Sequence, residues 1–151
     1  MKLQMAQIGP WEFAIPQGWT AKDNEVSNAY FEEPAGTMGL YVQAIELAQP
    51  RAAARQVADH IQDLRYRGFT NSVDNGWNVV DRRSEVDGVL FRSALDLYDS
   101  RASYRALSLV LCDRNTALQL TLHDYWCEDY EARREVFSEI EKSMLRVRKA
   151  A

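Results

Sequence analysis

The pattern of apolar and polar positions is clearest between Trp77 and Tyr125, where it predicts four consecutive strands joined by tight turns. The pair Asp87-Gly88 predicts the first turn, because it tolerates the positive φ values of a two-residue hairpin loop. The run Cys112-Asp113-Arg114-Asn115-Thr116 predicts another turn further along. Strands joined by so few residues must reverse direction, so we expect an antiparallel meander.

The last two strands of this meander differ in character. The run from Leu107 to Leu111 contains few polar residues, which predicts a central strand. In the next strand the apolar positions Leu118, Leu120 and Leu122 alternate with the polar positions Gln119, Thr121 and His123. The alternation predicts one buried face and one face in contact with water.

Shorter segments precede the meander. Alternation and Gly-Pro or Pro-rich breaks predict strands over Leu3 to Ile8, Trp11 to Ile15, Asn28 to Glu32 and Met38 to Leu47. The polar residues from Thr20 to Ser27 predict a loop.

The apolar period changes twice to that of a helix. Apolar residues at three- and four-residue spacing predict an amphipathic helix over Arg51 to Arg67, with Pro50 in its first turn and Gly68 as its C-terminal stop. A second helix closes the chain, with acidic residues near its start and basic residues near its end, as the helix dipole favours. Its apolar stripe comprises Tyr130, Phe137, Ile140, Met144 and Val147.

The order of these elements predicts an α+β fold. We expect a twisted antiparallel sheet of about six to seven strands packed with two main helices, an α/β sandwich. Neither an internal repeat nor a linker divides the sequence, so residues 1–151 are expected to form a single domain.

Composition narrows the class of protein. The 151 residues carry a formal net charge of −4, which argues against broad nucleic-acid binding and against an anionic membrane surface. Two cysteines are too few for a disulfide framework, and the N-terminal residues lack the apolar core of a signal peptide. We therefore expect a cytoplasmic protein with reduced thiols and no stable membrane association.

The densest group of reactive residue types is His123-Asp124-Tyr125-Trp126-Cys127. A small hydrolase or transferase could use His123 with Cys127 or with a carboxylate, since a nucleophile needs a base within hydrogen-bond reach. The alternative is structural: His123 on a strand, Asp124 at a turn and Cys127 in the core. Paired metal ligands at short spacing are absent from the sequence, so we expect no metal and no cofactor.

Aromatic residues gather in the later strands and at the entry to the last helix, interleaved with acidic residues. Tyr and Trp dominate interface hot spots, so this stretch predicts a surface for a protein partner, with a core role as the alternative. The predicted partner-binding residues are Tyr98, Gln119, Thr121, His123, Tyr125 and Trp126.

Several segments together resemble the PsbP/Mog-like superfamily. They are Phe13 to Trp19, Gly39 to Val42, Gly68-Phe69, the hairpin at Asp87-Gly88, and the closing run from Phe137 to Met144. The resemblance implies a twisted antiparallel sheet sandwiched with helices, and binding more than catalysis. Its relatives include a plant photosystem subunit, a fungal protein that binds a small GTPase, and bacterial adaptors of type VI secretion effectors.

Among these relatives, the present chain resembles the bacterial branch. It implies a non-catalytic accessory protein of a secreted effector or toxin, either an adaptor that holds the effector or an immunity protein that blocks the toxin. A small-ligand carrier, with a cavity between helix and sheet, is a further possibility.

Overall fold

The computed structural model describes residues 2–47, 53–71, 75–88, 90–113, 115–144 and 148–149. Its largest element is a seven-stranded sheet in which every neighbouring pair is antiparallel. In spatial order the strands are β3 (Thr20–Asn24), β4 (Asn28–Glu32), β5 (Met38–Glu46), β9 (Thr116–Asp124), β8 (Tyr104–Cys112), β7 (Leu90–Asp99) and β6 (Trp77–Asp87).

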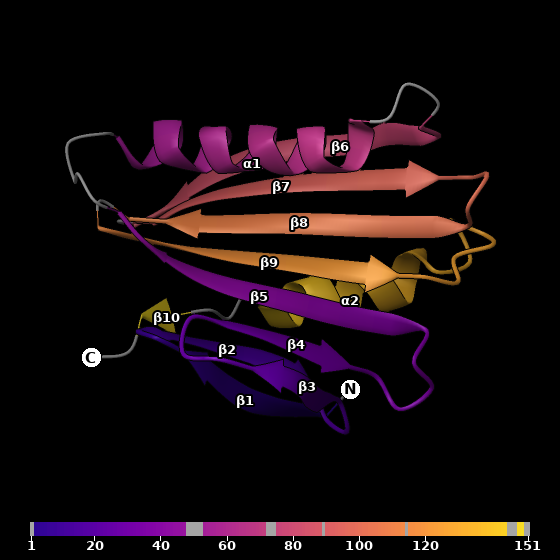
Figure 1. Ribbon diagram of the computed structural model, residues 1–151, viewed down its shortest axis with the longest axis horizontal. Coiled ribbons are helices and arrows are strands. Elements are labelled where there is room, and N and C mark those ends of the chain that lie inside the picture. Colours follow the sequence, from indigo (N-terminus) through magenta and orange to yellow (C-terminus); the bar gives the residue numbers. More distant parts are fainter. Residues whose placement is uncertain are drawn as a thin grey trace.

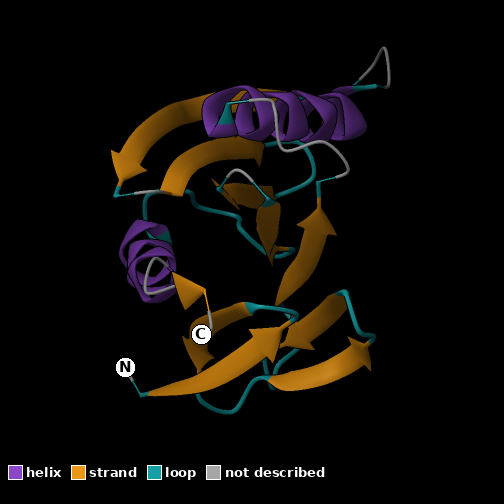
Figure 2. Ribbon diagram, turned by 90° about the vertical axis from the view of Figure 1, so that its left-hand side faces the viewer, coloured by secondary structure: helices purple, strands orange, loops and turns teal. Residues whose placement is uncertain are grey.

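The two helices lie on opposite faces of this sheet. Figure 1 shows α1 (Ala54–Thr70) in front of the large sheet and α2 (Arg134–Met144) behind it. A smaller sheet of β1 (Leu3–Ile8), β2 (Trp11–Pro16) and β10 (Arg148–Lys149) packs beside α2. Figure 2 shows α1 at one end of the molecule and the N-terminal strands at the other, with the sheet twisting between them. The predicted α+β sandwich is therefore confirmed.

Each face of the large sheet carries its own apolar core. On the α2 side, Phe137 and Ile140 pack with Trp11 and Phe13 of β2 and with alternate residues of β8 and β9. On the α1 side, Ala58 and its neighbours on the helix pack on a smaller cluster from β7, β8 and β9. Burying both layers drives the association of helices and strands.

The prediction that one face of β9 is exposed to solvent is wrong. Leu118, Leu120 and Leu122 enter the larger core, but Gln119 and Thr121 on the opposite face are buried too, with exposed fractions of 5% and 0%. The alternation arose because one face is apolar and the other is polar, and polar residues can lie under a helix as well as in water. β8 lies between β9 and β7, so its prediction as an interior strand is confirmed.

The first predicted turn forms one residue later than expected. Asp87 pairs with Leu90 at the end of the β6–β7 hairpin, so Gly88 leads the turn, and it does so with φ at +61°. A left-handed φ favours glycine, which explains its place there. The second turn is confirmed: the Asp113 carboxylate accepts hydrogen bonds from the backbone N–H groups of Asn115 and Thr116.

Three predicted boundaries differ from the structure. Residues 20–24 form the edge strand β3 instead of a loop, because a mostly exposed edge strand needs no apolar alternation. α1 continues past Gly68 to Thr70, where Phe69 packs on Trp77 at 4.9 Å between ring centroids. α2 begins at Arg134, so Tyr130 lies in the preceding turn. Pro50, Arg51 and Val147 lie outside the described residues.

No helix in the described ranges is both long and apolar enough to cross a membrane.

Candidate functional site

His123 lies at the centre of a group of aromatic rings on the α1 face of the large sheet. It is the next-to-last residue of β9, paired with Gly39 on β5 and Ala106 on β8. Its Nδ1 lies 2.5 Å from the hydroxyl of Tyr104, and its ring stacks on Tyr125 with centroids 5.4 Å apart and planes 3° apart. Hydrogen bonding and stacking together fix the imidazole in one orientation.

The rings around His123 come from almost every element at this end of the sheet. Tyr104 contacts both Trp77 of β6, at 5.0 Å between centroids, and Tyr125, at 5.3 Å. Trp77 in turn contacts Phe69 in the last turn of α1. We refer to this group as the aromatic cluster, which comprises Tyr30, Phe69, Trp77, Tyr104, His123 and Tyr125.

Gly39 makes room for the sixth member of the aromatic cluster. The ring of Tyr30, on β4, lies over Gly39 and places its hydroxyl 3.0 Å from the hydroxyl of Tyr125. A Cβ atom at position 39 would overlap the Tyr30 ring and its hydroxyl oxygen. A glycine within a strand often marks such a close approach.

Burial controls the protonation of the polar members. Burial, followed by the nearby Arg65 charge, lowers the pKa of His123 to about 4. Burial raises the pKa of Tyr104 to about 12 and also raises that of Tyr125. At neutral pH the imidazole is therefore neutral and both hydroxyls keep their protons.

Arg65 borders the aromatic cluster from α1. Burial lowers its pKa, opposed by the neighbouring hydroxyls of Tyr41 and Tyr104. Its Nε atom is buried and has no hydrogen-bond partner among the described residues. No sequence pattern distinguishes this residue, because Arg65 and Arg67 lie near the end of a helix, where basic residues are typical of a solvated surface.

The exposed part of this region is the turn after β9. Trp126 is 68% exposed and Tyr125 is 36% exposed. The turn is nevertheless well held, since Asp124 accepts a hydrogen bond from the Trp126 backbone N–H at 3.1 Å and forms an ion pair with Arg133 at 2.9 Å. Two adjacent aromatic side chains are thus presented to solvent on an ordered turn.

Five of the six predicted binding residues fall into three environments. Tyr125 and Trp126 are exposed, and His123 is half-buried in the aromatic cluster. Gln119 and Thr121 are buried on the α1 face, so in this conformation neither reaches the surface. A binding role for the six residues as one surface stays a prediction.

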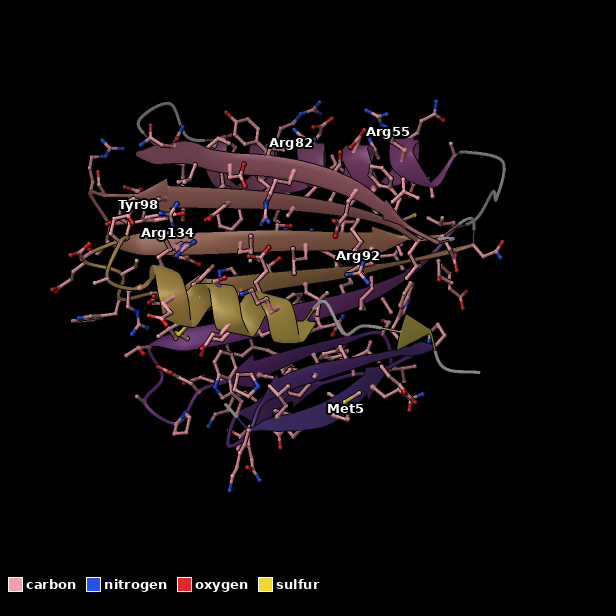
Figure 3. All side chains as sticks on the ribbon, turned by 180° about the vertical axis from the view of Figure 1, so that it is seen from behind. Met5, Arg55, Arg82, Arg92, Tyr98 and Arg134 are labelled. Carbon is pink, nitrogen blue, oxygen red and sulfur yellow. The ribbon has the colours of Figure 1, made fainter. Side chains whose placement is uncertain are left out.

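Tyr98 lies on the other side of the sheet, which Figure 3 shows with α2 in front. Its hydroxyl donates a hydrogen bond to the Cys127 carbonyl at 2.9 Å. Beside it, Arg105 and Asp96 form a buried ion pair at 2.8 Å that also binds the Tyr130 hydroxyl. The Arg105 guanidinium lies over the Phe137 ring at 3.8 Å, which anchors α2 to the sheet.

The acidic and aromatic surface expected from the sequence forms only in part, because Glu128 and Asp129 are exposed and the other three carboxylates are internal. Asp96 and Asp124 are buried in ion pairs with Arg105 and Arg133. Asp99 is buried and accepts hydrogen bonds from the backbone N–H groups of Arg101 and Ala102. These carboxylates stabilise the fold and do not contribute a negative surface beside the rings.

The pairing of His123 with Cys127 does not form. His123 faces α1, whereas the Cys127 thiol lies among Asp96, Arg105 and Asp124 on the α2 side. Burial raises the pKa of Cys127, which disfavours its thiolate. The only side-chain hydrogen bond that His123 makes within the described part of the chain joins it to Tyr104, so no carboxylate orients it as a base.

The described ranges contain no group of three or more His, Cys, Asp or Glu residues arranged to hold a metal ion. Cys112 and Cys127 are both buried and free.

Comparison with known proteins shows the fold. No family model matches the sequence, and a search of curated proteins finds no match. Among solved structures, cyanobacterial PsbP (CyanoP) from Synechocystis sp. PCC 6803 is similar, with a TM-score of 0.68 at 13% identity over 97% of this chain and 92% of that one. The Ran-binding protein Mog1p of Saccharomyces cerevisiae is similar with a TM-score of 0.62 at 10% identity over 99% and 96%. The chain therefore has a PsbP/Mog-like fold.

Proposed function

We propose that this chain is a non-catalytic protein-binding module that serves a bacterial secreted effector or toxin. Its role would be that of an adaptor or chaperone, or of an immunity protein. It would act in the cytoplasm as a single domain, without a cofactor and without binding nucleic acid. The proposal rests on one observation above all, the exposure of Trp126 and Tyr125 on the ordered turn after β9.

Exposed aromatic side chains on a rigid support suit a binding role. Burying a tryptophan at an interface removes a large apolar area from water at little cost in conformational entropy. Asp124 fixes the backbone of the turn, and stacking on His123 fixes the Tyr125 ring. Such a pre-ordered pair can dock without paying for its own ordering.

The fold supports binding more than catalysis. Mog1p, whose fold is similar, is a Ran-binding protein. The residues that a hydrolase or transferase would need, His123 and Cys127, face opposite sides of the sheet. A similar fold does not identify a partner, so the assignment of an effector or toxin as the partner is part of our proposal.

Co-expression with the products of adjacent reading frames tests this function. The tagged chain should retain one neighbouring effector or toxin through native purification, and Trp126→Ala should weaken the complex at least about tenfold, as expected for an interface hot spot. Val86→Ala is the matched control, because Val86 is 73% exposed on a distant hairpin. Survival of cells that produce the toxin would identify an immunity protein, and effector solubility without protection would identify an adaptor.

If the chain retains no neighbouring product, the proposed function is contradicted. If Trp126→Ala binds the partner as well as the wild type does, the proposed binding surface is contradicted.

A further inference from the structure

Arg65 is a cation without a counter-charge. Among the described residues it takes part in no ion pair, and its buried Nε atom has no hydrogen-bond partner. A guanidinium withdrawn from water loses solvation that only a hydrogen-bonded anion restores well. The arrangement is therefore unfavourable in isolation and becomes favourable when an anion arrives.

Three arginines elsewhere in the described part of the chain form ion pairs with carboxylates. Arg105 binds Asp96 and Arg133 binds Asp124, each within 2.9 Å. Arg83 on β6 binds Glu141 of α2. Arg65 differs from these three in facing hydroxyls and rings instead of a carboxylate.

The surroundings of Arg65 suit a carboxylate. The hydroxyls of Tyr41 and Tyr104 lie near enough to the guanidinium to influence its pKa. The Tyr104 hydroxyl also shares a hydrogen bond with His123 Nδ1, and it can donate its proton to an anion in the tautomer whose Nδ1–H donates to Tyr104. His123 is neutral at neutral pH, so its ring neither attracts the anion away from Arg65 nor repels the Arg65 guanidinium. Tyr41 is 38% exposed, which leaves this side of the site open to solvent.

We propose that Arg65, with Tyr41 and Tyr104, binds a carboxylate presented by an acidic side chain of the protein partner. The planar guanidinium matches a carboxylate through paired N–H donors, and this match gives direction as well as attraction. Tyr125 links the site to the exposed turn, since it stacks on His123 and precedes Trp126. The inference rests on the proposed function, and it adds that the partner places an acidic residue beside its contact with Trp126.

A titration with simple carboxylates tests the site without the partner. The probes are sodium acetate, against sodium chloride at equal ionic strength, and two blocked tripeptides, N-acetyl-Ala-Asp-Ala-amide and its Asn counterpart. The readout is the nitrogen and proton shift of the Arg65 Nε–H group by NMR. We expect saturable shifts with acetate and the Asp peptide, with dissociation constants of about 1 to 10 mM, as befits so small a ligand.

Variants of the same helix separate a site from general charge attraction. Arg65→Gln should weaken acetate binding at least about tenfold. Its binding is followed at the ring resonances of Tyr104 and His123. Arg65→Lys should also bind weakly, because lysine keeps the positive charge but lacks the paired N–H donors of the guanidinium. The exposed Arg67→Gln is the matched control and should bind as the wild type does. Circular dichroism confirms that each variant is folded.

The site is refuted if neither carboxylate saturates, if the Asn peptide shifts Arg65 as the Asp peptide does, or if Arg67→Gln loses as much binding as Arg65→Gln. Recovery of a partner that binds Arg65→Gln undiminished would refute this site and leave the protein-binding function intact. Carboxylate binding without any recovered partner would leave the site standing and contradict the function.

Discussion

The hydroxyl of Tyr30 lies 3.0 Å from the hydroxyl of Tyr125, although the two residues are 95 positions apart in the chain. Tyr30 reaches Tyr125 only by lying across β5 where that strand has Gly39. The contact connects β4 to the turn that carries Trp126. Because Gly39 has no side chain, the Tyr30 ring can reach Tyr125 and complete the aromatic cluster.

Gly39→Ala should destabilise the protein. The backbone at Gly39 does not have a positive φ, so alanine meets no backbone strain there, and the cost comes from the new methyl group against the Tyr30 ring. We expect a loss of about 1 to 3 kcal/mol in the free energy of unfolding, as for overpacking in a core. Urea denaturation measures it.

The double variant Gly39→Ala/Tyr30→Leu supplies the control, since a smaller side chain at position 30 removes the clash. It should be more stable than expected from adding the two single changes. Strict additivity would show that the Tyr30 ring is not what meets the methyl group.

Stability should fall as the pH falls from about 6.5 to about 4. His123 has a pKa near 4 in the folded protein and about 6.5 when unfolded, so the unfolded chain binds a proton that the folded chain does not. The stabilising effect of the neutral ring is complete above pH 6.5 and is lost as the pH decreases through this window. The groups that face His123 are Arg65 from α1, Tyr104 from β8 and Tyr125, and all keep their charge state over this range.

The loss attributable to His123 should reach about 2 to 3 kcal/mol by pH 4. It is measured as the difference in unfolding free energy between pH 7 and pH 4.5 in the wild type and in His123→Gln, which cannot titrate. The variant should lose less stability than the wild type over the same interval. An equal loss in both proteins would mean that other groups account for the pH dependence.

Removing one partner of the buried ion pair on the α2 side should cost far more than removing a surface partner. Asp96→Asn leaves the Arg105 guanidinium buried without a counter-charge, and we expect a loss of about 3 to 5 kcal/mol. Asp59→Asn, which breaks the exposed pair with Arg55, should cost less than about 0.5 kcal/mol. Chemical denaturation of both variants compares them directly, and similar losses would contradict the anchoring role of Arg105 for α2.

Local pattern was sufficient for most of the fold and insufficient for the site. The strands around Leu107 and Leu118 and the turn at Asp113 follow from short-range apolar alternation and turn chemistry. The burial of Gln119 and Thr121 does not, because it depends on which other parts of the protein pack over that face. A polar residue in a strand looks the same in sequence whether water or protein covers it.

The aromatic cluster could be predicted only in part. His123 and Tyr125 can be identified from the sequence, because they are close in the chain and chemically distinctive. Tyr30, Trp77 and Arg65 come from β4, β6 and α1, and only the tertiary fold brings them together. Whether Arg65 has a counter-charge depends on the residues that surround it in the folded protein, so no local sequence motif can predict it.

Both cysteines should be unreactive in the folded protein. Burial raises the pKa of Cys112 to about 11, and burial together with the Asp124 carboxylate raises the pKa of Cys127. Neither side chain is exposed, and the thiolate is the reactive form. Under native conditions at pH 7.5, Ellman's reagent should label both at least about a hundredfold more slowly than a free thiol, and in urea it should label both fully.

Rapid native labelling of Cys127 alone would instead indicate an accessible, activated thiol. Such a result would revive a cysteine nucleophile for this chain, although His123 could serve as its base only after a rearrangement of the turn that joins them.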